Sequence, residues 1–230
     1  MRVLISETTW ASSAIAHDLT GQGFLLSRAN DGEEALLYVR DAVQEAAVID
    51  ADLGDITADR AIRSLRVFRP NLPVFAIAEG AGRETCRALF AAGADHVATA
   101  LSEPAEVAAR LRALARRAAG YTSPLATLGQ VAVNFDTRRV SVGGIPLALT
   151  PAEYEIVEHL TLRRRQIVSR DEMMTHLYGL EDAPDPKILD VHTTRIRKKL
   201  AAAGADPRQL RALHGRGFTF DGMRAEPVAA

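Results

Sequence analysis

The sequence predicts an α/β protein of two domains, a doubly wound parallel sheet followed by a winged helix-turn-helix. Three observations support this fold class. The length of 230 residues suits two domains of ordinary size. Apolar strand patterns alternate with helical patterns up to about residue 119, and short alternating strands with Gly-rich turns then replace them. The carboxyl-terminal part adds a basic helix that is followed by a hairpin pattern.

The first domain, expected over residues 1–119, contains five units of a strand followed by a helix. The expected strands are residues 3–5, 24–27, 46–49, 72–77 and 96–98, and the expected helices are residues 10–19, 32–40, 58–68, 83–92 and 103–119. This alternation predicts a five-stranded parallel sheet of the flavodoxin-like type with helices on both faces. Ligand chemistry then belongs at the carboxyl ends of the strands, where Glu7 and Asp50 stand.

The second domain begins after a segment that contains Gly, Thr, Ser and Pro. The expected boundaries are a linker at 120–126, a domain at 127–222 and a flexible tail at 223–230. Thr150 and Glu153 form a capping box around Pro151, and Ser169 is the cap of a second helix. The expected elements are strands at 131–133, 139–142 and 146–149, helices at 151–162, 169–178 and within 185–203, and a hairpin of 210–213 with 218–220.

The net charge of −1 conceals a difference between the two halves. Residues 1–120 carry 13 basic and 16 acidic side chains, whereas residues 121–230 carry 15 basic and 13 acidic ones. Within residues 187–216, eight basic side chains accompany only Asp190 and Asp206. Such a local cationic surface favours contact with nucleic acid in spite of the near-neutral total.

Several other classes of function find no support in the sequence. No uncharged apolar run approaches the ~18 residues of a membrane span, and the amino terminus has no secretory pattern, so we expect a cytoplasmic protein. Cys86 is the single cysteine and cannot form an internal disulfide. The six histidines are scattered, without a nucleophile and base or a metal-ligand spacing, which argues against an enzyme.

The third helix of the second domain combines an apolar stripe with cationic side chains. The stripe is expected to consist of Ile188, Val191, Ile196 and Leu200. The polar side chains off this stripe are Lys187, His192, Thr194, Arg195, Lys198 and Lys199. A charge run alone is more often a solvated helix face. The hairpin that follows, with His214 and Arg216 at its tip, instead favours DNA, with the helix in the major groove and the hairpin in the minor groove.

Four motifs, LTPAEYEIVEHL, IVSRDEMMTHLYG, DVHTTRIRKKL and HGRGFTF, resemble the DNA-binding domain of OmpR/PhoB-type response regulators over the whole second domain. Within that family, the HLYG, KILDV, RKKLAA and GRGF segments look most like those of alphaproteobacterial cell-cycle regulators. The resemblance implies base contacts by Thr194 and Arg195, backbone contacts from the same helix, and wing contacts from the hairpin. The DNA-binding set that it implies is His192, Thr194, Arg195, Arg197, Lys198, Lys199, His214 and Arg216.

Two further consequences follow from the resemblance. Regulators of this type dimerise on direct repeats, whose centres lie about 10 base pairs apart. Thr194 stands where many relatives carry Arg, so the DNA sequence that they prefer does not carry over to this chain. The expected partners are therefore double-stranded DNA and a second copy of the chain.

The first domain resembles a receiver domain in its length, its alternation and the phrases ANDGEEAL, AVIDADLGD and AGADHV. Phosphoryl transfer to an aspartate needs a carboxylate nucleophile, acidic ligands for a divalent cation, and a fixed positive charge. The resemblance implies that Asp50 is the phospho-acceptor candidate, and that Glu7 and Asp50 are the acidic residues available to a magnesium ion.

The other parts of the receiver motif are missing. Thr8 replaces the second acid, Ala78 the switch hydroxyl residue, Ala100 the lysine, Leu101 the proline after it, and Val97 the switch aromatic. The magnesium site is therefore expected to be weak or absent, and no cofactor is required. We expect a regulator that depends little or not at all on phosphorylation, in which Asp50 is either a structural acid or a slow acceptor.

The resemblance also implies a symmetric dimer face built from the fourth helix, fifth strand and fifth helix of the receiver. The charged residues available for it are Arg87, Asp95, Glu106, Arg110 and Arg117. His96 stands where an acid is usual, so the pairing must differ from that of relatives. The alternative is that these charges form an ordinary exposed surface, since surface ion pairs contribute only ~0–1 kcal/mol each.

The partners beyond DNA are less specified by the sequence. In this family the loop 162–167 is placed to contact RNA polymerase, whereas the need for a histidine kinase or phosphotransfer protein is left open by the incomplete receiver motif. The alternative from another class of function is that the chain is a signalling adaptor. Its basic domain would then contact RNA polymerase instead of a specific operator. Sequence-selective DNA binding distinguishes the regulator from the adaptor.

Overall fold

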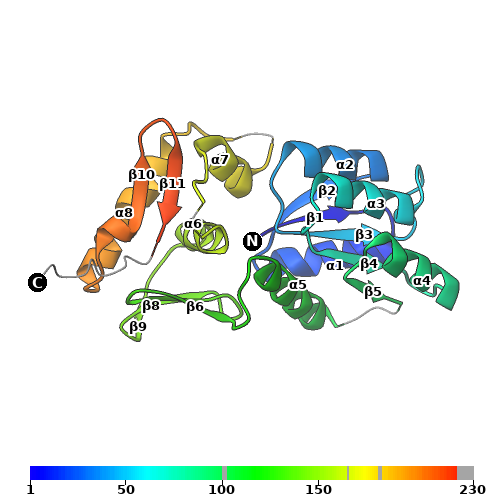
Figure 1. Cartoon of the computed structure of the whole chain (residues 1–230), viewed down its shortest axis with the longest axis horizontal. Helices are drawn as coiled ribbons and strands as arrows, with labels where there is room; N and C mark the ends of the chain where they lie inside the picture. The colour runs from blue at the N-terminus through cyan, green and yellow to red at the C-terminus, as the bar shows by residue number, and fades with distance from the viewer. Residues whose placement is uncertain (100–102, 165, 181–182, 222–230) are drawn as a thin grey trace, which may run out of the picture. The chain divides into compact units, whose positions relative to one another are not determined.

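The computed structural model describes residues 1–99, 103–164, 166–180 and 183–221. The chain divides into two compact units, Met1–Ala118 and Ala119–Ala230 (Figure 1). The first is built around a parallel sheet with a hydrophobic core on each face. In its described residues, the second has a separate core surrounded by a small sheet, three α-helices and a hairpin.

The amino-terminal unit alternates strands and helices as predicted. Its strands are β1 (Arg2–Ser6), β2 (Leu25–Ala29), β3 (Ala46–Asp50), β4 (Val74–Ile77) and β5 (His96–Ala98). Its helices are α1 (Trp10–Gly21), α2 (Gly32–Asp41), α3 (Ala58–Phe68), α4 (Arg83–Ala92) and α5 (Pro104–Ala118). All the strand pairs are parallel and the strand order is β2-β1-β3-β4-β5, which confirms the predicted five-stranded doubly wound sheet.

Helices cover both faces of this sheet because successive side chains of a strand point in opposite directions. Leu4 of β1 belongs to the core under α2, α3 and α4. Val3 and Ile5 of the same strand belong to the core under α1 and α5. Every residue of β1 and β3 is buried, as expected for strands that are covered on both sides.

The carboxyl ends of β1, β3 and β4 lie side by side along one edge of the sheet, because these strands are parallel neighbours. Glu7 follows β1, Asp50 is the last residue of β3, and Ala78 follows β4. The sheet topology therefore gathers the residues that correspond to the receiver motif, at the edge where α/β domains hold their ligands.

The carboxyl-terminal unit opens with an antiparallel sheet in the order β6-β7-β8-β9. Its elements are β6 (Leu125–Leu128), β7 (Val131–Asn134), β8 (Arg139–Val142), β9 (Ile145–Leu147), α6 (Pro151–Leu162), α7 (Arg170–Tyr178), α8 (Ile188–Ala202), a 3₁₀ helix (Pro207–Gln209), β10 (Leu210–Leu213) and β11 (Gly217–Phe220). The winged helix-turn-helix prediction is confirmed. Leu125 and Ala126, which the sequence analysis assigned to the linker, are part of β6, and Ala126 is buried.

Side-chain caps fix where α6 and α7 begin. The Thr150 hydroxyl accepts from the Glu153 amide over 3.3 Å, and the Glu153 carboxylate accepts from the Thr150 amide over 2.8 Å. This confirms the predicted capping box, with Pro151 at the first helical position. The Ser169 hydroxyl accepts from the Glu172 amide over 3.0 Å at the start of α7.

The hairpin of β10 and β11 is attached to the chain just before α7. Val168 and Phe218 exchange backbone hydrogen bonds of 2.9 and 2.8 Å. Gly217 makes this approach possible, since its φ is +130° and a Cβ there would lie 2.0 Å from the Val168 carbonyl oxygen. Phe218 and Phe220 are buried in the core below, so the hairpin is anchored at its base while its tip is exposed.

Candidate functional site

The buried face of α8 consists of Leu189, Thr193, Ile196 and Leu200, which recur every three or four residues. This corrects the apolar stripe expected from the sequence, which included Ile188 and Val191. Ile188 is only partly buried, and Val191 is 42% exposed. The position of the helix against α6 and the 3₁₀ helix, rather than hydrophobicity alone, decides which residues face the core.

The exposed face of α8 carries Val191, Thr194, Arg195 and Lys198 on adjacent turns. Residues three and four apart share one side of a helix, so these side chains form a continuous surface. We call this set the α8 stripe. Val191 and Thr194 carry methyl groups, which can contact thymine methyl groups in a major groove. The cations Arg195 and Lys198 can contact guanine edges and phosphates there. The sequence pattern predicts that Val191 lies in the core, so its exposure on the α8 stripe is not evident from the sequence.

Three members of the expected DNA-binding set have partners inside the carboxyl-terminal unit. Arg197 Nε donates to the Leu210 carbonyl over 2.9 Å, which joins α8 to the hairpin. Lys199 Nζ forms an ion pair of 2.6 Å with Glu153 at the start of α6. His192 Nε2 lies 3.5 Å from the Tyr178 hydroxyl of α7. These contacts orient α8 within its unit.

His192 is also poorly suited to carry a positive charge. Burial lowers the pKa of its imidazole below the ordinary value, and the nearby Arg195 guanidinium acts in the same direction, whereas Glu153 opposes both. Arg195 and Lys198 are the stronger cationic candidates on this helix.

The hairpin presents a second group of the expected DNA-binding residues. His214, Gly215 and Arg216 are exposed and connect β10 with β11. The turn is closed by the Arg216 amide, which donates to the Leu213 carbonyl over 2.9 Å. The exposed Arg216 can reach a narrow groove, where negative potential attracts guanidinium groups.

Arg170, at the first position of α7, helps to position α8 and the hairpin. This role is not evident from the sequence. The terminal nitrogen of Arg170 contacts the Asp190 carboxylate of α8 at 2.5 Å, and its guanidinium lies 5.2 Å from the centre of the Phe218 ring. Arg170 therefore links α7, α8 and the hairpin. Its sequence position carries no signal for this role, because the contacts join segments that are separated along the chain.

Glu7 and Asp50 lie at the edge of the sheet where β1 and β3 end, which we call the acidic edge. The Asp50 carboxylate there accepts hydrogen bonds from the chain itself. Asp50 is buried, with 4% of its surface exposed. One oxygen accepts from the Thr9 hydroxyl over 2.5 Å, and the other accepts from the Asp52 amide over 3.0 Å. The Asp50 amide donates to the Ser6 hydroxyl over 2.7 Å. These contacts make Asp50 part of the local structure that begins α1.

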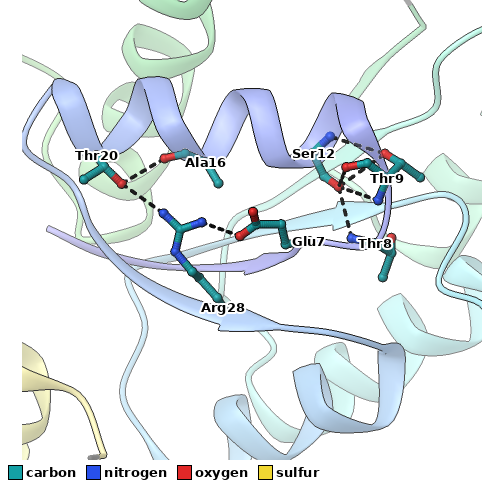
Figure 2. Close-up of polar contacts among 7 residues, drawn as sticks. All are labelled: Glu7, Thr8, Thr9, Ser12, Ala16, Thr20 and Arg28. Carbon is teal, nitrogen blue, oxygen red and sulfur yellow. Dashed lines mark hydrogen bonds and ion pairs between the residues drawn. The ribbon is translucent and has the colours of Figure 1, made fainter. Parts of the chain in front are cut away.

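The second surviving acid, Glu7, has a different partner. It forms an ion pair with Arg28 of β2, and Figure 2 shows its carboxylate turned toward that guanidinium. Thr8 donates its hydroxyl to the Asp52 carbonyl over 2.5 Å. Thr9 and Ser12 form the capping box of α1 on the other side of the view (Figure 2). Neither Arg28 nor Thr9 was singled out from the sequence.

The remaining positions of the receiver motif carry no polar group where the structure describes them. Ala78 is buried and has no hydroxyl with which to bind a phosphoryl group. Val97 packs against the core on the α2, α3 and α4 face. Ala100 and Leu101 lie outside the described residues. Glu7 and Asp50, the two carboxylates that match the receiver motif, therefore each already have a partner.

Four of the five charged residues expected on the dimer face lie on α4 and α5. Arg87 is 3.9 Å from Glu84, one turn earlier on α4. Arg110 forms an ion pair of 2.5 Å with Glu106 on α5. Arg117 is exposed near the end of α5. Both pairs join residues of a single helix, and all of these side chains are accessible.

Asp95 and His96 have other surroundings. The Asp95 carboxylate contacts the Arg66 guanidinium of α3 at 2.7 Å and accepts from the Val74 amide over 2.7 Å. His96 packs on Phe75, with 4.6 Å between the ring centres. Burial lowers the pKa of His96, and the Arg110 guanidinium contributes in the same direction. Asp95 therefore stabilises its own domain, and His96 adds a predominantly neutral ring beside α5.

The comparisons with known proteins agree with this architecture. Residues 144–220 match the family described as "Transcriptional regulatory protein, C terminal". The chain is 32% identical over 221 residues to the cell cycle transcriptional regulator CtrA of Caulobacter vibrioides, with 96% of each chain covered. It is 32% identical over 234 residues to the cell cycle response regulator CtrA of Brucella abortus, with 98% of each covered.

Among solved structures, the response regulator DrrB of Thermotoga maritima, an OmpR/PhoB homologue, aligns with a TM-score of 0.45 and 21% identity over 96% of this chain and 99% of that one. Within the described residues, no helix is long and apolar enough to cross a membrane. The full-length identity to CtrA and the matched carboxyl-terminal domain confirm the resemblance seen in the sequence. This chain belongs to the OmpR/PhoB-type response regulators, which are two-domain DNA-binding transcription regulators.

Proposed function

We propose that the chain binds specific DNA sequences as a dimer on repeated half-sites, and that it does so with little or no dependence on phosphorylation of Asp50. The α8 stripe carries the first part of this proposal. Its exposed residues include Thr194 and Arg195 in its middle and Lys198 one turn later, and the exposed tip of the hairpin adds His214 and Arg216.

Each part of this surface has a distinct role in the proposal. Arg195 contacts a guanine edge, and Val191 and Thr194 lie against thymine methyl groups, which provides discrimination between bases. Lys198 neutralises a phosphate and so contributes affinity without sequence preference. Arg216 enters the adjacent minor groove. Arg197 and Lys199 act indirectly, because they hold α8 against the hairpin and α6.

The independence from phosphorylation is supported by the partners of Asp50. A phosphoryl group on this carboxylate would displace the Thr9 hydroxyl and the Asp52 amide that now bind it. The product would find no hydroxyl at Ala78 and no acid at Thr8. Stabilisation of the transferred charge by a metal and by fixed donors is the main source of catalysis in phosphoryl transfer. We therefore assign Asp50 the role of a structural acid.

The proposal implies a limited set of partners. They are double-stranded DNA, a second copy of the chain that pairs through α4, β5 and α5, and RNA polymerase at the loop 162–167. No cofactor and no cognate kinase are required. A protein that acts on chromosomal DNA works in the cytoplasm of a bacterium. Regulation then comes from the amount of protein or from a partner that binds it.

Selection of bound sequences from a random duplex library tests the DNA-binding claim. We expect one enriched half-site motif, repeated at a fixed spacing. Arg195→Ala should reduce the preference for that motif by about tenfold or more, since a bidentate base contact contributes about 1–3 kcal/mol of discrimination. Arg139→Ala, which alters an exposed arginine of β8 in the same unit, is the matched control. Binding without any enriched motif would instead favour the adaptor function.

A further inference from the structure

The acidic edge of the amino-terminal unit contains a cation that the chain itself supplies. Arg28 forms an ion pair with Glu7, and its other terminal nitrogen donates to the Thr20 hydroxyl over 3.3 Å. That hydroxyl donates to the Ala16 carbonyl over 2.9 Å, so its lone pairs remain available to Arg28. Figure 2 shows the guanidinium held between Thr20 of α1 and Glu7 at the end of β1.

The pairing of β1 with β2 brings Glu7 and Arg28 together. Ile5 of β1 and Arg28 of β2 are partners in the parallel register, and the Glu7 amide donates to the Ala29 carbonyl over 2.7 Å. Glu7 therefore leaves β1 directly beside the strand that carries Arg28. The side chains are 24% and 46% exposed, respectively, so the ion pair is reachable by dissolved ions but is partly shielded from water.

The residues at this edge do not fit a magnesium ion. Divalent cations of this kind need several oxygen ligands, among which carboxylates supply the negative charge. The charge of Glu7 is balanced by the guanidinium, and the oxygens of Asp50 accept from Thr9 and Asp52. Thr8 supplies no charge, and its hydroxyl donates to a backbone carbonyl. A magnesium ion would have to separate an existing ion pair and would be repelled by its cation.

We propose that Arg28 is a built-in counter-ion of Glu7 that excludes divalent cations from the receiver and keeps its acidic edge in one conformation. The inference rests on the proposed independence from phosphorylation. It gives a physical reason for that independence, because phosphoryl transfer needs the divalent cation that Arg28 excludes. Two separate features disable the metal site, namely Thr8 in place of the second carboxylate and the Arg28 guanidinium beside Glu7. Restoring the carboxylate alone should therefore give weak metal binding, and removing the cation as well should strengthen it.

A magnesium titration of the full-length protein separates these two contributions. Trp10 is the only tryptophan, is 75% exposed, and follows the residue whose hydroxyl binds Asp50, so its fluorescence reports on the site. The thermal unfolding midpoint in the same titration is a second readout. The proteins are the wild type, Thr8→Asp, Arg28→Gln, the double variant Thr8→Asp/Arg28→Gln, and the control Arg40→Gln, which removes a surface ion pair with Asp41 on α2.

We expect the wild type and Arg40→Gln to show no saturable response to millimolar magnesium. The double variant should saturate at a concentration about tenfold lower than Thr8→Asp, because a like charge close to the ion is removed. Equal midpoints for the double variant and Thr8→Asp would overturn the role of Arg28. A saturable response of the wild type at the midpoint of the double variant would overturn it as well.

Thr20→Val provides a second route if Arg28→Gln impairs folding. It removes the hydroxyl that positions the guanidinium but keeps the charge, and in the Thr8→Asp background it should lower the magnesium midpoint by a smaller factor. Failure of this inference differs from failure of the proposed function. If the double variant binds magnesium no better than Thr8→Asp, and the wild type shows no response to magnesium, only the counter-ion role of Arg28 is rejected. A wild type that accepts phosphate at Asp50 and then binds DNA more tightly rejects the proposed independence itself.

Discussion

Lys198 and Lys199 are neighbours in the sequence but lie on different faces of α8. Lys198 is exposed on the α8 stripe, whereas Lys199 is paired with the buried Glu153 carboxylate at 2.6 Å. The same division separates Arg195, which is exposed, from Arg197, which donates to the Leu210 carbonyl. In each pair, one cation is available to DNA and the other positions the helix.

The two lysines should therefore respond differently to substitution. Lys198→Ala is expected to weaken binding to all duplexes alike and to reduce the slope of log K against log salt by about 1, as for a lost phosphate contact. Lys199→Ala is expected to leave that slope nearly unchanged and to lower the unfolding free energy by about 1 kcal/mol. Fluorescence anisotropy across a salt series and urea unfolding measure the two effects. A reduced slope for Lys199→Ala would place this lysine on the DNA instead.

Glu153 gives this ion pair a pH dependence. Burial tends to raise the pKa of its carboxyl, but the hydrogen bonds from Lys199 and the Thr150 amide outweigh burial and lower the pKa below the ordinary 4.5. A carboxyl with a lowered pKa in the folded state stabilises the protein above its unfolded value and loses that contribution as the pH falls through the folded value.

Glu153→Gln should therefore be less stable than the wild type at neutral pH, and the difference should shrink below pH 4.5. Urea unfolding of both proteins across this range measures the difference. Glu106→Gln, which alters an exposed ion pair on α5, is the control and should have little effect at any pH. A constant difference between Glu153→Gln and the wild type down to low pH would contradict the assignment.

At the scale of elements, the hairpin depends on the close approach of Gly217 to the strand before α7. Gly217→Ala would place a Cβ 2.0 Å from the Val168 carbonyl oxygen in a backbone conformation with φ +130°. We expect a loss of at least about 2 kcal/mol of unfolding free energy, together with weaker DNA binding.

Gly215→Ala at the tip of the same hairpin is the matched control. Its φ is also positive, at +66°, but a Cβ there meets nothing within 4 Å. We expect a smaller loss of about 1 kcal/mol from backbone strain alone. Equal losses for the two variants in urea unfolding would show that backbone conformation, and not the contact with Val168, limits substitution at Gly217.

The elements also show what local sequence patterns can predict. Capping residues are local signals, so Thr150 and Ser169 located the starts of α6 and α7 correctly. The buried face of α8 was misassigned at Val191, because hydrophobicity alone does not say how a helix is rotated against its neighbours. The pairs Glu7–Arg28 and Thr9–Asp50 could not be predicted, since their members are brought together only by the sheet register and the position of α1.

At the scale of the whole molecule, the chain has two units with separate cores. In the proposed function, the first unit forms the dimer and the second binds DNA. A dimer that binds direct repeats should require a fixed spacing of its half-sites. Inserting about 5 base pairs between them should abolish cooperative binding, because it rotates one site by half a turn, and inserting about 10 should restore it in part. Electrophoretic mobility shifts on such duplexes test this arrangement. Equal cooperativity at every spacing would contradict it.

The central claim is that DNA binding does not depend on phosphorylation of Asp50. Its most direct test treats the wild type and Asp50→Asn with magnesium and a small-molecule phosphodonor, and follows intact mass and affinity for the selected duplex in the same samples. We predict no Asp50-dependent gain of mass and the same affinity for both proteins, with and without the donor. An added phosphoryl group on the wild type alone, accompanied by tighter DNA binding, would contradict the claim and show that the incomplete receiver still relays a signal.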